Sequence, residues 1–124
     1  MYTTKIVKDD MEVTTIVDQP EIAFGENLRG TVYIEGCANE AAIDFIQLEV
    51  LVRNRLTGLE RTITKHDIQM VGNVKSKEAE MIVFDIVPDD RWMIDQSNDL
   101  ILRTSLQLFA EEILRAEDVF LYNH

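Results

Sequence analysis

The chain of 124 residues contains one cysteine and two histidines, and this scarcity excludes several kinds of site. Because Cys37 has no second cysteine to pair with, no intrachain disulfide can form, which fits a reducing compartment. Cys37 lies in a predicted turn without a basic neighbour, so we interpret it as an unreactive thiol. The sequence also lacks the cluster of cysteines and histidines that a zinc site requires.

The two histidines do not provide a catalytic base. His124 is the last residue, where chains fray, and His66 stands in the middle of a predicted strand. Its neighbour Asp67 projects to the opposite face of that strand and cannot orient the imidazole ring. The sequence therefore predicts a protein that is not an enzyme, with no catalytic residues and no cofactor.

Basic residues are few: 12 lysines and arginines stand against 23 aspartates and glutamates, a formal net charge of −11. Such a chain is repelled by phosphate backbones and by anionic lipid headgroups, so we expect no nucleic-acid binding and no membrane insertion. The excess of acid favours solubility, and it also fits a basic partner protein or a cation. The N-terminal residues MYTTKIVKDDM form neither a signal peptide nor a spanning segment, and we expect a cytoplasmic protein.

The two prolines and five glycines punctuate short β-rich runs. Residues 26–35 alternate apolar with polar side chains, which is typical of a strand with one face on a core. Gly30 lies inside that strand, where glycine marks a bulge or a close backbone approach. Gly58 follows a long β pattern over residues 41–56, and its freedom to adopt a positive φ predicts a hairpin tip.

The same patterns predict six or seven strands separated by turns at intervals of roughly ten to fifteen residues. A change of parity after Phe45 indicates a bulge in the 41–56 run. The window 110–117 (AEEILRAE) favours a short helical turn, and residues 118–123 form the predicted last strand. We therefore expect an all-β protein, an antiparallel β-sandwich of immunoglobulin-like, arrestin-type architecture, in one domain over residues 1–124.

Four side chains are candidates for a functional site. Asp89 and Asp90 share a predicted loop with further acids, and their oxygens could hold calcium, although the spacing matches no known calcium loop. A ligand-binding sandwich for calcium or carbohydrate is thus one alternative. Tyr33 and Trp92 are the aromatics expected to be partly exposed, and exposed aromatics can anchor a protein interface, although a core or shielding role is the favoured interpretation of both. Edge strands of a sandwich also pair readily with another chain, so a homodimer through such an edge is a second possibility.

Several segments resemble the N-terminal domain of the arrestin-like sporulation-control proteins of bacilli, the SpoOM family. Residues 25–36 (GENLRGTVYIEG) match its motif Gly-Glu-x-Val-x-Gly-x-Val-x-Val-x-Gly, and residues 42–48 (AIDFIQL) match its segment x-Ile-Asp-x-Ile-x-Leu. Residues 81–88, 100–108 and 117–122 resemble its later strands. The chain departs from the family pattern at Phe24, where members have proline, at Cys37, where they have glycine, and in residues 1–10, which lack the amphipathic start.

The resemblance implies an arrestin-like sandwich in the cytoplasm that works by binding other proteins, with a regulatory link to sporulation or envelope stress. Members of this family usually carry a second arrestin-like domain, whereas we expect this chain to contain a single such domain. The family offers no catalytic residues to transfer. The resemblance therefore predicts a non-enzymatic interaction or scaffold module, without identifying its partner or the surface that binds it.

Overall fold

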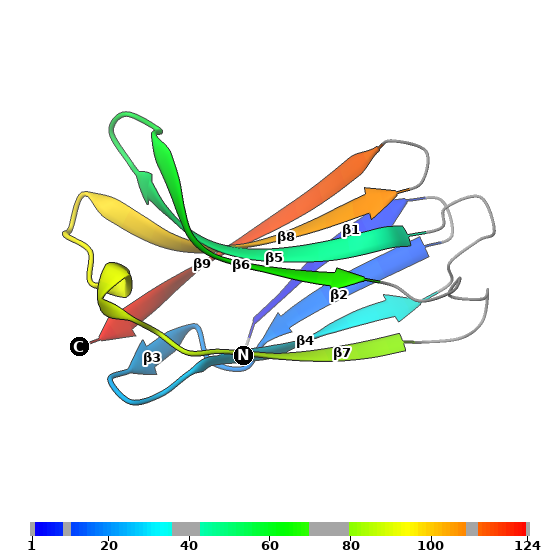
Figure 1. Ribbon diagram of the computed structural model, residues 1–124, viewed down its shortest axis with the longest axis horizontal. Helices are drawn as coiled ribbons and strands as arrows, with labels where there is room; N and C mark the ends of the chain where they lie inside the picture. The colour runs from blue at the N-terminus through cyan, green and yellow to red at the C-terminus, as the bar shows by residue number, and fades with distance from the viewer. Residues whose placement is uncertain (1, 9–10, 36–42, 70–79, 109–111, 124) are drawn as a thin grey trace.

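The computed structural model describes residues 2–8, 11–35, 43–69, 80–108 and 112–123 and shows two β-sheets packed face to face (Figure 1). The described elements are, in chain order, β1 (Tyr2–Lys8), β2 (Met11–Val17), β3 (Glu21–Ala23), β4 (Leu28–Glu35), β5 (Ile43–Asn54), β6 (Glu60–Gln69), β7 (Glu80–Ile86), the short 3₁₀ helix η1 (Asp90–Trp92), β8 (Asn98–Leu108) and β9 (Ile113–Asn123). The predicted all-β sandwich is confirmed.

The smaller sheet has four antiparallel strands in the order β1-β2-β4-β7. Its strands show the period-two burial that the sequence predicts: in β2 and β4 every second side chain is buried. Because β1 and β7 are the outermost strands, each has a strand neighbour on one side only among the described residues. This sheet therefore offers two edges.

The larger sheet has five strands in the order β3-β9-β8-β5-β6. Its pairs are antiparallel except for β3, a three-residue strand parallel to the end of β9 that the sequence patterns do not predict. The hairpin β5–β6 turns at Gly58, whose φ of 75° confirms the predicted tip. The irregularity expected near Phe45 lies between Ile43 and Phe45 in the pairing with β8.

The core fills the space between the two sheets. Large side chains from both sheets are fully buried there, among them Met11, Ile34, Leu102 and Phe120. Trp92 closes the core at the end of the sandwich where η1 crosses, as Figure 1 shows for the coil after β7. Burying such side chains supplies most of the free energy that holds two sheets together.

Gly30 stands at the tightest contact in the smaller sheet. It pairs with Val17 on one side and with Phe84 on the other. A Cβ atom at this position would lie 2.1 Å from the carbonyl oxygen of Ile16 and 2.4 Å from the Phe84 ring. The glycine is therefore needed for close approach, because the ring lies across bare backbone, as aromatic side chains do opposite strand glycines.

The helical turn predicted near residues 110–117 is wrong. Residues 113–117 belong to β9, where Leu114 pairs with Leu106 and Ala116 with Thr104. The eight-residue window has good helix formers, but two turns are too short to be stable alone, and pairing along β8 buries every second residue instead. The predictions for Cys37, His124 and the break at residues 71–73 lie outside the described residues.

We predict that Gly30→Ala lowers the free energy of unfolding by about 3 kcal/mol, since the added methyl group meets backbone that cannot rotate away. Thr31→Ala, at the neighbouring outward position of β4, should cost less than about 1 kcal/mol. Urea denaturation of both variants measures the difference. Equal losses would contradict the close approach at Gly30.

Candidate functional site

In the acidic loop after β7, the first aspartate, Asp89, bonds to another residue of the same loop. The Asp89 carboxylate caps η1 by accepting from the Arg91 backbone N–H at 2.8 Å, and it also forms an ion pair with the Arg91 guanidinium at 2.5 Å. Hydrogen bonds from that guanidinium, above all, hold the pKa of Asp89 below its ordinary value. Asp90 is exposed in the first turn of η1. The two carboxylates therefore differ: that of Asp89 is bonded within the loop, and Asp90 is exposed.

The carboxylate of Asp95, in the same loop, is also bonded to neighbouring residues of the loop. Its carboxylate accepts from the backbone N–H of Ser97 at 2.9 Å and from the side-chain amide of Asn98 at 3.0 Å. These are the bonds of a turn closed by an aspartate. Among the described residues, no three potential ligand side chains gather as a metal site, so the geometry adds no support to the calcium alternative.

Trp92 is fully buried, and the expectation that it is partly exposed is wrong. Its ring contacts two aromatic rings of β9 edge-on, Phe120 at a centroid distance of 5.4 Å and Tyr122 at 6.1 Å. The polar residues around it in sequence belong to the loop that folds it inward, which is why the local pattern misleads. Trp92 stabilises the end of the core and offers no contact surface.

Tyr33 lies on the outer face of the smaller sheet and is half-buried there, as expected for a partly exposed aromatic. It pairs with Met81 of β7, whose side chain is 58% exposed, and the next outward pair is Thr31 with Val83, which is 68% exposed. Ile16 of β2, opposite Thr31, is also half-buried. We call these four apolar side chains, Ile16, Tyr33, Met81 and Val83, the outer strip.

The outer strip reaches the edge of the sheet. Strand β7 is last in the strand order, so one side of its backbone has no strand partner among the described residues. An edge strand with exposed apolar side chains is a template for pairing with another extended chain. Proteins usually blunt such an edge with lysine or proline, and the β7 sequence EMIVFDI contains neither. The exposed Met81 and Val83 were not singled out from the sequence, although their alternation with Ile82 and Phe84 was visible.

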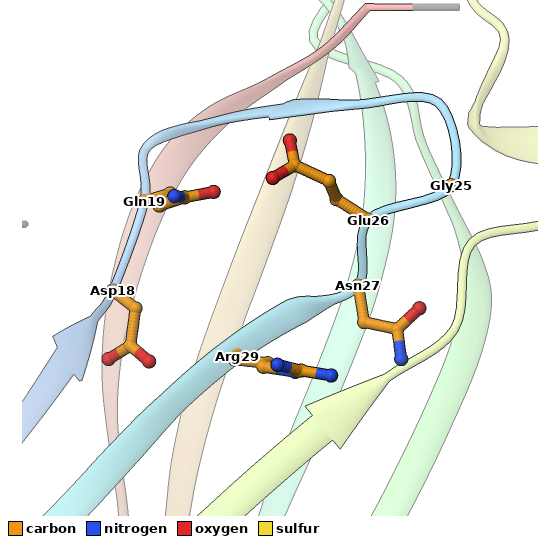
Figure 2. A pocket seen from close by; sticks show the side chains of 6 residues that line it. All are labelled: Asp18, Gln19, Gly25, Glu26, Asn27 and Arg29. Atoms are coloured by element: carbon orange, nitrogen blue, oxygen red, sulfur yellow. The ribbon is translucent and has the colours of Figure 1, made fainter.

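A polar hollow of about 410 Å³ lies at the turns that flank β3. Figure 2 shows the side chains of Gln19 and Glu26 turned toward each other across it, with Arg29 below Asn27. Its lining is largely engaged within the protein. The Glu26 carboxylate accepts from the Ala23 N–H at 2.6 Å, and Arg29 pairs with Asp85 at 3.2 Å. The charged groups of Glu26 and Arg29 are thus already bonded to residues outside the lining of the hollow.

The outer face of the larger sheet carries a neutral cluster of two arginines and two glutamates. Arg53 contacts Glu117 at 2.8 Å and Glu60 at 3.0 Å, and Arg103 contacts the same two carboxylates. Hydrogen bonds from Arg53 and then Arg103 hold the pKa of Glu60 below its ordinary value. Burial raises the pKa of Glu117, but the same arginines outweigh it and its pKa is also lowered. The charges cancel within the cluster, which leaves no unpaired charge for a ligand.

His66 lies exposed on the edge strand β6, opposite Leu48 in the register. Asp67 accepts from the Gln47 side-chain amide at 2.8 Å instead of orienting the imidazole. Within the described ranges, no helix is long and apolar enough to cross a membrane.

The outer strip with its free β7 edge is therefore the candidate site that the described residues leave unoccupied.

We predict that Arg103→Ala lowers the free energy of unfolding by about 1–3 kcal/mol at pH 7, because its 14% exposed side chain holds two carboxylates that would lose a partner. Arg29→Ala, which removes an ion pair between a 62% exposed arginine and a 48% exposed aspartate, should cost less than about 1 kcal/mol. The lowered pKa values of Glu60 and Glu117 mean that the cluster stabilises the fold above pH 4.5 and loses this effect as the pH falls. Denaturation at pH 7 and pH 3 checks both points, and a pH-independent penalty would contradict them.

The comparisons with known proteins agree with the fold. The crystal structure of Spo0M, a sporulation control protein from Bacillus subtilis, superposes with a TM-score of 0.74 at 18% sequence identity. The match covers 94% of this chain and 51% of that one, so the chain spans about half the length of that protein. A search of curated protein sequences finds no match.

The family comparison is the more specific result. Residues 8–108 match the family described as SpoOM protein, which is well over half of the chain. The match includes β4, β5 and β7, the strands whose motifs carry the resemblance in the sequence. The chain therefore belongs to the SpoOM family of sporulation-control proteins.

Proposed function

We propose that this domain is a non-enzymatic protein-interaction module that binds an extended segment of another protein along the β7 edge. The observation that carries the proposal is the outer strip, in which Met81 and Val83 expose more than half of their surface beside an edge with no strand partner in the described structure. An added strand would gain main-chain hydrogen bonds from β7 and side-chain burial from the strip. No catalytic step is required of any residue.

Charge complementarity favours a basic partner. The chain carries a net charge of −11, and the β7 sequence EMIVFDI has two acids and no lysine or arginine. A segment with alternating apolar and basic residues would bury its apolar side chains on Met81 and Val83 and meet an attractive field. A second copy of this chain would bring another −11 to the interface, so a partner of opposite charge suits this edge better than a homodimer.

Membership in the SpoOM family supports a partner that acts in the control of sporulation, and we propose a cytoplasmic location for the domain. The related protein from Bacillus subtilis is described as a sporulation control protein, which supports a regulatory role. A binding module fits such a role, because regulators act through the proteins they hold. A carbohydrate or calcium site is not favoured by any contact described above.

We predict that Val83→Lys and Met81→Lys each abolish capture of a partner that the unaltered chain retains from a cytoplasmic extract. The substitutions remove apolar contact and repel a basic segment, while exposed positions tolerate lysine with little loss of stability. Val83→Glu should weaken capture less, because its charge attracts the same partner. Binding is then measured by calorimetry with the captured protein in purified form.

Val119→Lys is the matched control, since Val119 is 55% exposed on the outer face of the opposite sheet. It should bind as the unaltered chain does. The proposal is wrong if all variants capture the same proteins, or if none is captured specifically. Light scattering separates the homodimer: a mass of twice 14.3 kDa that returns to 14.3 kDa in Val83→Lys would make the partner a second copy.

A further inference from the structure

One carboxyl group lies inside the sandwich, away from the β7 edge. Asp118 projects inward from β9 and is only 4% exposed. Its Oδ1 accepts a hydrogen bond from the Thr4 hydroxyl of β1, and its Oδ2 is buried without a partner among the described atoms. Asp118 is therefore a buried acid with half of its hydrogen-bonding capacity unused.

The neighbours of Asp118 are polar but uncharged. Thr4 pairs with Thr15 in the register of β1 and β2, and the Thr15 hydroxyl donates to Thr104 of β8 at 3.2 Å. These residues form a polar layer that crosses the core between the sheets. The described side chains at inward positions around the carboxyl group are not ionisable: Thr4 and Ile6 on β1, Thr15 on β2, Leu102 and Thr104 on β8, and Ala116 and Phe120 on β9.

Burial raises the pKa of Asp118, and the hydrogen bond from Thr4 only partly opposes this effect. A buried carboxylate without an opposite charge is unfavourable, because it has lost its water and gained a single donor. A side chain that supplied a positive charge with several N–H donors would satisfy both oxygens. A lysine or arginine opposite Asp118 would thus suit this site better than Thr4, the residue that lies there.

Strand β1 is weakly held over this site. It is an edge strand, and of its described side chains Ile6 alone belongs to the core. Val7 is largely exposed, and Lys5 points outward to an exposed ion pair with Glu12 at 2.8 Å. Through its described side chains, β1 is therefore held by Ile6, by the Thr4–Asp118 hydrogen bond and by the exposed Lys5–Glu12 ion pair, in addition to its backbone pairing with β2.

We infer that β1 is a displaceable strand, and that the β2 edge beneath it is a second binding site for an extended basic segment of another protein. The incoming segment would pair with β2, place a lysine or arginine at the position of Thr4, opposite Asp118, and place an apolar residue at the position of Ile6. Its charge would neutralise the buried carboxylate, which Thr4 cannot do. This site lies at the opposite edge of the smaller sheet from β7 and does not depend on the function proposed above.

The probe is a synthetic peptide with the sequence of residues 2–8 that carries Thr4→Lys, labelled with a fluorophore and added to the full 124-residue chain. Fluorescence anisotropy should show binding at least tenfold tighter than that of the peptide with the natural sequence. Ile6→Ala in the protein should tighten binding further, because it weakens the resident strand that competes with the peptide. Amide hydrogen exchange should become faster in the protein's own residues 2–8 and stay unchanged in β8.

Asp118→Asn is the decisive variant, since it keeps the shape of the side chain and removes the charge. It should erase the tenfold preference for the lysine peptide, whereas Asp67→Asn, the same change at an exposed position of β6, should leave it intact. Equal binding of the two peptides, the same preference in Asp118→Asn, or unchanged exchange in residues 2–8 would each overturn the inference.

The stability of Asp118→Asn gives an independent test that needs no ligand. Because the pKa of Asp118 is raised in the folded state, the contribution of this side chain to stability falls as the pH rises from about 3.8 through the raised pKa. Asp118→Asn should therefore have the higher melting temperature at pH 7, and the difference should shrink toward pH 4. A lower melting temperature than the natural chain at both pH values would show that the carboxylate is well satisfied, and would contradict the inference.

Discussion

The approach of the Phe84 ring to the backbone of Gly30 is the contact on which the smaller sheet depends. It brings β7 against β4 with Phe84 directed into the core, and this determines which side chains of β7 face inward and which face outward. Since side chains alternate along a strand, Met81 and Val83 must then face outward. The same contact that completes the core therefore creates the apolar outer strip, and a residue larger than glycine at position 30 would disturb both.

The two edge strands of the smaller sheet differ, since β1 (YTTKIVK) carries two lysines and β7 carries none. The β7 edge exposes apolar side chains without lysine or proline, and the β1 edge is held over a buried, half-satisfied carboxyl group. Both features favour an extended segment with positive charge, which agrees with the excess of acid in the chain. The larger sheet presents a contrasting outer face, where Arg53, Arg103, Glu60 and Glu117 neutralise one another. The two proposed binding edges thus belong to one sheet of the sandwich.

Much of the fold follows from the sequence, because alternation and turn glycines are local signals. The strand around Gly30 and the hairpin at Gly58 both appear where the residues predict them. The failure at residues 110–117 has a specific cause. In the described part of this window, the apolar Ile113 faces outward and is 50% exposed while its neighbour Leu114 faces inward, so two adjacent apolar residues hide the period of two.

The candidate site was harder to predict, because it depends on which strands become neighbours. Tyr33 could be named as an exposed aromatic, but its place beside Met81 follows only from the pairing of β4 with β7. Trp92 has polar neighbours in sequence, and its burial depends on contacts with Phe120 and Tyr122, nearly thirty residues away. The pairing of Thr4 with Asp118 joins the two ends of the described chain, which no local pattern reveals.

The central claim is that a partner protein adds a strand at the β7 edge. Amide hydrogen exchange of the chain, measured alone and in complex with the protein that it captures, tests this most directly. The account predicts slower exchange in Glu80–Ile86 and no change in Glu60–Gln69, the free edge of the larger sheet. Protection confined to the larger sheet, or a complex that leaves β7 exchanging as it does alone, would contradict it.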